Sequence, residues 1–244
     1  MRTLDSLQIR MIDFLKSRDG NGLLFCDAGT QKTYATLAFI KSQNYKRILI
    51  LCPKTAKKNW SNEIALAGLD PARFQIENYE VLLTKRGAKL LTPWDCIVAD
   101  EAHRVSHWTA KSTKRFHKLT AAHRIALSGT PWKNKIWEAH SIMHWIEPRC
   151  LGANWWEFRS RFCITNPRIP GQIIGVRNEE LIQAVIGRLS LRVYRDEPEV
   201  KAAMKLPELV TREYRFPLTA AEAKNVKEIK DDALLTVNSG EKLL

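Results

Sequence analysis

The chain has 244 residues, of which 45% are hydrophobic, so it is long enough for one large domain with a buried core, or for one domain and part of another. Its formal net charge of +13 favours a polyanionic partner, and nucleic acid is the commonest polyanion. Five cysteines without a CxxC pair argue against a disulfide framework or a zinc ribbon, the N-terminus does not resemble a secretory signal, and no apolar run approaches the roughly 20 residues of a membrane span. We therefore expect a cytoplasmic protein, associated with the nucleoid or present in the host cytoplasm if it is phage-encoded, and no membrane partner.

Short apolar runs alternate with helical patterns through the first 130 residues. The runs span 22–26, 47–52, 74–79, 96–100 and 124–129, and the helix-like stretches span 32–42, 55–67, 80–91 and 111–121. Continuous apolar runs of this length are typical of strands that are buried on both faces. Strand and helix in repetition predict an α/β domain with a mostly parallel sheet, which binds ligands where the carboxyl ends of its strands meet.

The pattern changes after about residue 135. The expected elements are aromatic-rich helices, a loop or short hairpin, an amphipathic helix, an extended strand and a last helix, at 136–165, 166–176, 178–190, 206–219 and 219–235 respectively. The last strand and helix have little left to pack against, so we suspect a fragment that enters a further domain. His140 and His144 are spaced as some zinc ligands are, but no third ligand lies nearby, and we interpret them as a packed or surface pair.

The stretch DAGTQKT, 27–33, has the layout of a phosphate-binding loop. It follows a predicted buried strand and precedes a predicted helix, the context in which backbone N–H groups and a helix N-terminus hold phosphate. Lys32 would reach the β- and γ-phosphates of a nucleotide, and the Thr33 hydroxyl would bind Mg²⁺. The loop residues that would surround the phosphates are Asp27, Ala28, Gly29, Thr30 and Gln31. An ordinary loop is the alternative, because Gln31 stands where such loops carry glycine.

The stretch CIVADEAH, 96–103, strengthens the case for a nucleotide site. It is a buried strand that ends in two carboxylates. Asp100 can hold Mg²⁺ beside Thr33, and Glu101 can orient or deprotonate an attacking water. His103 can transmit the state of the nucleotide to neighbouring elements. Two carboxylates at the end of a strand that follows a phosphate loop match the layout of phosphoryl-transfer enzymes, with Lys32, Asp100 and Glu101 as the catalytic candidates.

At these residues the chain resembles the first RecA-like domain of superfamily 2 helicases, in the Swi/Snf-type, chromatin-remodeller-like branch of DNA-dependent ATPases. The resemblance rests on six stretches in order: LQIRMIDFL at 7–15, DAGTQKT at 27–33, ILILCPKTAKKNWSNEI at 48–64, NYEVL at 78–82, VADEAHRVSH at 98–107 and RIALSGTPWKN at 124–134. It implies a RecA-like P-loop NTPase domain with a parallel sheet, followed by a helical extension. It also implies ATP and Mg²⁺ as cofactors, and Gln8 as the residue that reads adenine.

The same resemblance implies a division of the chain and a partner. Residues 1–145 would form the first RecA-like domain, 146–205 a helical extension, and 206–244 the start of a truncated second RecA-like domain. Superfamily 2 motors need that second domain for their arginine fingers, so this chain alone should hydrolyse ATP poorly. The motif at the end of the fifth strand, in which Pro131 and Asn134 also match the family, would couple DNA contact to the nucleotide site through Ser128, Gly129 and Thr130; a tight turn before Pro131 is the structural alternative, and both can hold.

Basic residues mark where DNA would lie. Pro53, Lys54 and Thr55 follow a predicted strand and open a helix, and Lys57 and Lys58 lie in its first turn. A helix N-terminus together with ammonium groups suits backbone phosphates, and Lys111 begins a second basic cluster. Neither cluster offers an obvious element for reading bases, so binding should be salt-sensitive and weakly sequence-specific.

Gln31 leaves alternatives open. A glutamine held at positive φ costs about 1–3 kcal/mol, whereas a helical conformation there would cost little. We expect the intact protein to translocate on or remodel double-stranded DNA. The alternatives are a nucleic-acid-binding module with weakened catalysis, and a fragment of an RNA helicase.

Overall fold

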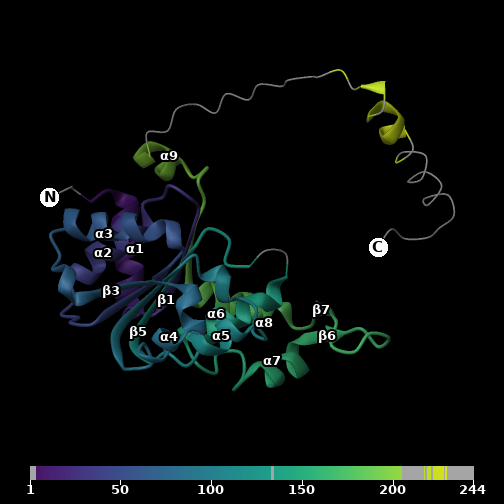
Figure 1. The fold of residues 1–244 in the computed structure, drawn as a ribbon, viewed down its shortest axis with the longest axis horizontal. Helices are drawn as coiled ribbons and strands as arrows, with labels where there is room; N and C mark the ends of the chain where they lie inside the picture. Colours follow the sequence, from purple (N-terminus) through teal and green to yellow (C-terminus); the bar gives the residue numbers. More distant parts are fainter. Residues whose placement is uncertain are drawn as a thin grey trace. The chain divides into compact units, whose positions relative to one another are not determined.

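The computed structural model describes residues 4–132, 135–204, 217, 219, 220, 222–227 and 229 (Figure 1). The chain divides into two units, Met1–Lys205 and Leu206–Leu244. In the second unit, the described residues include a short helical stretch that begins after Thr219, whose carbonyl accepts a hydrogen bond from Ala223 N at 2.9 Å. Asn134, the strand expected at 206–219 and most of the domain expected at 206–244 lie outside the described residues. No described helix is both long and apolar enough to cross a bilayer.

A six-stranded parallel sheet forms the centre of the first unit. Its order is β3-β2-β4-β5-β1-β8. The strands are β1 (Gly22–Cys26), β2 (Ile48–Cys52), β3 (Phe74–Asn78), β4 (Trp94–Asp100), β5 (Ala121–Ser128) and β8 (Ser190–Val193). All five residues of β2 are buried, as expected for a strand covered on both faces. The predicted α/β class and the five apolar runs are therefore confirmed.

Helices cover both faces of the sheet (Figure 1). They are α1 (Ser6–Ser17), α2 (Lys32–Lys41), α3 (Lys57–Leu66), α4 (Lys85–Ala88), α5 (Lys111–Phe116), α6 (Ala139–Ile146), α7 (Trp155–Phe162), α8 (Glu179–Leu189) and α9 (Pro198–Met204). Helices α1, α2 and α3 share one buried cluster with Leu24, Ile50 and Val98 of the sheet. Helices α5 to α8 share the other with Leu23 and Leu49, because successive strand residues point to opposite faces.

Two predicted helices are shorter than expected. The stretch 80–91 forms a 3₁₀ turn, Tyr79–Leu83, and the four-residue α4. The interruption lies at Thr84, whose backbone is extended and whose hydroxyl accepts a hydrogen bond from Gly87 N. The helix expected at 111–121 ends at Phe116, because the chain must turn before β5 begins at Ala121.

The region after residue 145 does not stand apart from the sheet. The predicted hairpin is present as β6 (Cys163–Thr165) and β7 (Ile173–Val176), and the predicted amphipathic helix is α8. Strand β8 was not predicted. It pairs in parallel with β1, with Leu23 opposite Ser190 and Cys26 opposite Val193. The segment 146–205, expected as a helical extension, thus packs within the first unit and supplies an edge strand.

Candidate functional site

Three adjacent strands bring the predicted motifs to one edge of the sheet. Strand β5 lies between β1 and β4, with Phe25 opposite Ser128 and Asp100 opposite Leu127. The phosphate-loop candidate follows β1, the carboxylate pair ends β4, and the coupling motif ends β5. Because all three strands are parallel, these segments meet at their carboxyl ends, where α/β sheets bind ligands.

The loop 27–31 leads into α2, which begins at Lys32. Thr30 is fully buried, and its hydroxyl donates to the carbonyl of Asp27 at 2.8 Å, which closes the loop on itself. A pocket of about 510 Å³ opens beside it, lined by Gly29, Gln31, Lys32, Thr33, Tyr34, Asn59 and Glu63. Lys32 and Thr33 therefore line a cavity at a helix N-terminus, as a phosphate site requires. Ala28 is exposed beside Gly29.

Gln31 has left-handed backbone geometry, with φ 56° and ψ 28°, so the strained alternative expected for this residue is the one that occurs. Its side chain makes no capping bond to α2. Instead, Gln31 Oε1 accepts a hydrogen bond from Gln8 Nε2 at 2.8 Å. Gln8, the expected adenine reader, is buried and does not line the pocket.

Asp100 accepts hydrogen bonds from three groups, and the sequence motifs did not predict that these groups would meet at this residue. Trp60 Nε1 donates to Oδ2 at 2.9 Å, and the backbone N–H of Glu101 donates to Oδ1 at 3.0 Å. Tyr79 donates its hydroxyl to the Asp100 carbonyl at 2.7 Å. Burial raises the pKa of the Asp100 carboxyl, while the Trp60 hydrogen bond and the Lys32 charge oppose that rise. The position thus suits a carboxylate that gains a cation.

His103 connects the carboxylate pair to the coupling motif. Its Nδ1 lies 3.3 Å from Glu101 Oε2 and 3.4 Å from Ser128 Oγ. Thr130 donates its backbone N–H to Ser128 Oγ at 3.2 Å. Glu101 itself has φ 52°, which turns the chain sharply after β4. The residues expected to couple the two sites are therefore in direct contact, and Gly129 beside them packs on the phosphate loop: a Cβ there would lie 3.4 Å from the Cys26 carbonyl.

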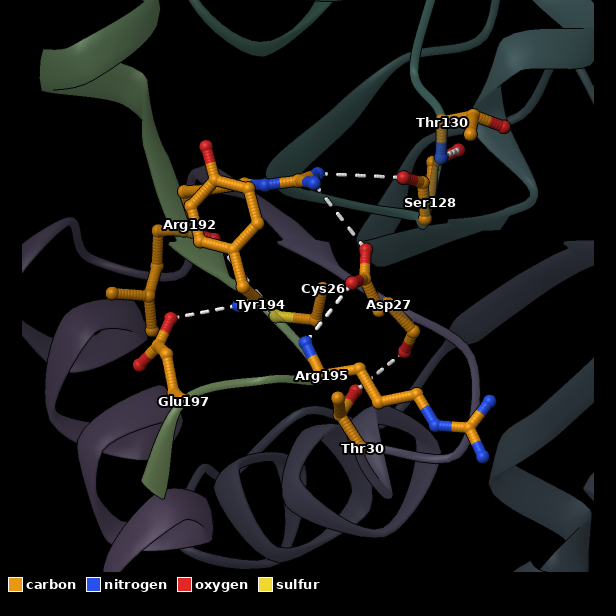
Figure 2. A network of polar contacts seen from close by, with 11 residues as sticks. Cys26, Asp27, Thr30, Ser128, Thr130, Arg192, Tyr194, Arg195 and Glu197 are labelled. Atoms are coloured by element: carbon orange, nitrogen blue, oxygen red, sulfur yellow. Dashed lines mark hydrogen bonds and ion pairs between the residues drawn. The ribbon is translucent and has the colours of Figure 1, made fainter. Parts of the chain in front are cut away.

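Arg192 of β8 adds a network that the sequence interpretation missed (Figure 2). Its Nη2 lies 3.3 Å from Asp27 Oδ1, and its Nη1 donates to the Gly129 carbonyl at 3.4 Å. The guanidinium is stacked between two rings, 3.7 Å from the centroid of Phe25 and 4.2 Å from that of Tyr194. Asp27 Oδ2 also accepts the backbone N–H of Arg195 at 3.0 Å. Arg192 thus contacts both the loop 27–31 and the motif at 128–130 from β8, the edge strand beside β1.

The basic candidates lie in two places, directly after the carboxyl end of β2 and at the start of α5. Pro53 precedes a 3₁₀ turn, Lys54–Ala56, and Lys54, Thr55 and Lys58 are exposed. Lys57 behaves differently, because its Nζ lies 3.4 Å from Glu77 Oε2, a carboxylate 3% exposed that also pairs with Arg86. Lys111 is exposed at the first position of α5. Lys54, Lys58 and Lys111 are therefore exposed and form no ion pair within the part of the chain that the structure describes, whereas Lys57 has an internal partner.

The described residues contain no group of three or more histidine, cysteine or acidic side chains that could hold a metal ion. His140 and His144 instead pack with His117 around Trp108, with ring centroids 4.4–5.3 Å from its indole. Burial lowers the pKa of His117 and of His140 to about 3, so both are neutral. Thr33 and Asp100 together offer a hydroxyl and a carboxylate, a donor set that fits Mg²⁺ when nucleotide phosphates complete its shell.

Two solved structures resemble this chain. The Sulfolobus solfataricus SWI2/SNF2 ATPase core in complex with dsDNA is 27% identical, with a TM-score of 0.65 over 80% of this chain and 45% of that chain. The SWI2/SNF2 ATPase core domain of the same organism is also 27% identical, with a TM-score of 0.63, 85% of this chain and 46% of that chain being covered. The fold is therefore the RecA-like fold of these ATPase cores, as the sequence motifs predicted.

Curated relatives agree with that fold. The CHD3-type chromatin-remodeling factor CHR7 of Arabidopsis thaliana is 27% identical over 62% of this chain and 16% of its own length. YwqA of Bacillus subtilis is 26% identical over 90% of this chain and 26% of its own length. The chain thus spans only a minor part of these relatives. The family model of the SNF2-related domain matches residues 71–243, well over half of the chain, and the chain belongs to that family.

Proposed function

We propose that this chain is the ATP-binding half of a motor that translocates on or remodels double-stranded DNA. The observation that carries the proposal is the meeting of Lys32, Asp100 and Ser128 at the ends of three neighbouring strands, beside a pocket of about 510 Å³. Unrelated loops have no reason to lie together, whereas phosphoryl transfer needs a phosphate-binding lysine and a metal-binding carboxylate close to each other. A reducing cytoplasmic compartment suits the five unpaired thiols, and we place the protein there.

Each residue has a role that follows from its position. Lys32 lies at the start of α2 and would bind phosphate with its ammonium group, supported by the N-terminus of the helix. Thr33 and Asp100 would hold Mg²⁺, which neutralises phosphate charge when it is bound. Glu101 would orient the attacking water. The ring of His103, which contacts both Glu101 and Ser128, would transmit a change at the Glu101 carboxylate to Ser128. Full activity would need the arginines of a second RecA-like domain.

Double-stranded DNA is the proposed partner. The exposed lysines Lys54 and Lys58 follow the carboxyl end of β2, Lys111 is exposed at the start of α5, and one of the similar structures is a complex with dsDNA. Contacts of this kind involve backbone phosphates, so we expect little sequence preference and a strong dependence on salt.

The first test is a titration of a fluorescent ATP analogue, with Mg²⁺, into the full chain and into Lys32→Ala. We expect micromolar binding that weakens about 10- to 100-fold in the variant, because a charge-assisted contact to phosphate is lost. Lys46→Ala, at the opposite end of β2, is the matched control and should bind as the wild type does. Equal affinity in all three proteins would refute the nucleotide site.

A second candidate function is a nucleic-acid-binding module with weakened catalysis, and the left-handed backbone of Gln31 favours it. Adding the missing second half and measuring ATP hydrolysis separates the two. A rate stimulated by duplex DNA supports the motor, and the same stimulation by RNA alone would indicate an RNA helicase. No hydrolysis under any of these conditions would support the weakened module.

A further inference from the structure

The hairpin of β6 and β7 has an exposed tip, residues 166–172. Its base is anchored, because Cys163 is only 3% exposed and both Ile173 and Val176 pack against the buried cluster that α5 to α8 share. Beyond this base the connecting loop projects away from the helices of the first unit (Figure 1). The side chains at the tip are therefore free to meet a partner.

Hydrogen bonds and prolines give the tip a defined shape. Asn166 donates its backbone N–H to the Gln172 carbonyl at 2.9 Å, and Gln172 donates its own to the Ile169 carbonyl at 3.2 Å. Pro167 and Pro170 fix the backbone on either side. The loop thus presents Ile169 on a constrained turn, where the residue is 51% exposed.

The hairpin and the helix before it carry positive charge only. Residues 158–178 contain four arginines and no acidic residue, the arginines being Arg159, Arg161, Arg168 and Arg177. Arg161 pairs with Glu157 of α7 at 3.2 Å, whereas Arg159 and Arg168 form no ion pair within the described residues. A surface of this composition favours a polyanionic partner.

The base of the hairpin lies beside a segment that already leads to a candidate DNA contact. Residues 171–173 line a pocket of about 260 Å³ together with residues 106–109, and that second segment runs into α5, which begins at Lys111. The exposed Lys135 lines the same pocket. The acidic side chain in its lining, Glu138, is only 11% exposed. The hairpin therefore extends a basic surface that includes Lys111.

The tip combines the two kinds of side chain that proteins place in the minor groove of DNA. Arginine is attracted by the negative potential of the groove, and an apolar side chain such as isoleucine or proline can enter between base pairs. Arg168 and Ile169 are adjacent and both exposed. A stable protein interface needs about 800 Å² of surface from each partner, and one isoleucine between two prolines offers far less apolar area than that.

We propose that the tip of the β6–β7 hairpin binds the minor groove of duplex DNA, with Arg168 on the phosphates at the groove and Ile169 inserted between base pairs. The inference rests on the proposed function for its choice of double-stranded DNA, but it requires no nucleotide. It adds a contact that surface lysines cannot make, because insertion of an apolar side chain bends the duplex.

The test measures binding of a duplex of about 25 base pairs, labelled with a dye at each end, to the full chain without nucleotide. We expect wild type to bring the ends closer, seen as increased energy transfer. Ile169→Ser should remove this bend and weaken binding about 3- to 10-fold, with the salt dependence unchanged. Arg168→Ala should reduce the slope of log affinity against log salt by about 0.9, the value of one phosphate contact.

Two variants are matched controls. Ile174→Ser changes an isoleucine of β7 that is 56% exposed and lies outside the tip, and it should bend DNA as wild type does. Lys46→Ala removes an exposed positive charge beside the start of β2 and should leave the salt slope unchanged. Thermal unfolding should be the same in all variants, since every substituted side chain is exposed.

The outcomes separate this inference from the proposed function. Equal bending by wild type and Ile169→Ser, or a wild-type salt slope in Arg168→Ala, would overturn the inference and favour an acidic protein as the partner of the tip. If Lys111→Ala still weakened binding, duplex DNA would remain the partner of the motor. A chain that binds no duplex DNA at low salt would overturn both. Bending that depends on Ile169, in a chain that binds no ATP analogue, would uphold the inference and count against the motor.

Discussion

Charged side chains and neutral rings occupy two different regions of the first unit. At the sheet edge, Asp27 and Glu101 face Arg192 and His103, and the chain adopts left-handed geometry at Gln31 and again at Glu101. Around α6 and α7, imidazole and indole rings pack against one another, with Trp108 between the histidines of α6 and Trp155 of α7. His140 is fully buried there, and neither of its ring nitrogens has a hydrogen-bond partner among the described residues. Charged pairs and left-handed residues thus occur where a ligand could contact them, whereas protonation of the buried histidines of the aromatic layer would oppose folding.

The largest expected effect is acid sensitivity of the aromatic layer. The pKa of His117 and of His140 is about 3 in the folded chain and about 6.5 when unfolded, so between these values the unfolded state binds more protons. The free energy of unfolding should therefore fall as the pH drops below about 6.5, by about 1.4 kcal/mol per pH unit for each histidine. His140→Phe should remove one such contribution, measured by urea denaturation at pH 7, 6 and 5.

The control for this experiment is His107→Phe, since the His107 side chain is 76% exposed. It should keep the wild-type dependence on pH. If His140→Phe and His107→Phe lose stability equally on acidification, the aromatic layer is not the acid-sensitive region.

Asp100→Asn changes a buried carboxylate at the sheet edge. Burial raises the pKa of this carboxyl, so its ionised form opposes folding at neutral pH, and the amide should leave stability unchanged or raise it by about 1 kcal/mol. Nucleotide binding should lose its dependence on Mg²⁺ in the same variant. Thermal unfolding and a titration with and without Mg²⁺ measure the two effects, and a large loss of stability would contradict this view of Asp100.

Arg192→Ala should lower the free energy of local opening of the loop 27–31 by about 1–2 kcal/mol. The substitution removes an ion pair and two ring contacts, which are partly exposed. Hydrogen exchange of the amides at 27–31 is the direct measurement, and it should accelerate. Arg188→Ala is the matched control, since Arg188 makes a comparable pair with Glu147 far along the chain from the loop. Equal exchange at 27–31 in both variants would show that Arg192 does not hold the loop.

The smallest effects are expected among the lysines at the end of β2. Lys54→Ala should reduce the salt dependence of DNA binding by about one phosphate contact and leave stability unchanged. Lys57→Ala should instead lower stability by about 1 kcal/mol, because Glu77 would lose one of the two cationic partners that it has among the described residues. Filter binding at several salt concentrations and thermal unfolding separate the two, and identical behaviour would contradict the assignment of Lys57 to Glu77.

Local patterns predicted most of the fold because buried parallel strands are continuous apolar runs. Strand β8 was not predicted because it lacks such a run: its residues at the sheet edge are mostly half-buried, and Arg192 interrupts the apolar pattern. The helix expected at 80–91 was wrong because an apolar pattern does not show that Thr84 will interrupt it.

The motif residues of the candidate site were predictable as a set, since strand ends and spacing carry that information. Their internal contacts were not. Gln8 and Gln31 are 23 positions apart, and Asp27 and Arg192 are 165 apart, so only the folded chain brings them together. A glutamine in place of glycine could be noticed in the sequence, but its partner could not be named there.

The pairing of β8 with β1 also has a consequence for synthesis in the cell. A ribosome adds about 5–20 residues per second, so the 165 residues between Asp27 and Arg192 take roughly 10–30 s to make. Until β5 is made, β1 has no partner strand; from then until β8 is made, β1 is an uncovered edge strand, and throughout the interval the loop at Asp27 lacks its arginine. The nascent chain would therefore pass through a stage in which the loop 27–31 exists without Arg192, and any molecule that reached β1 at that stage would meet a different surface from that of the folded chain.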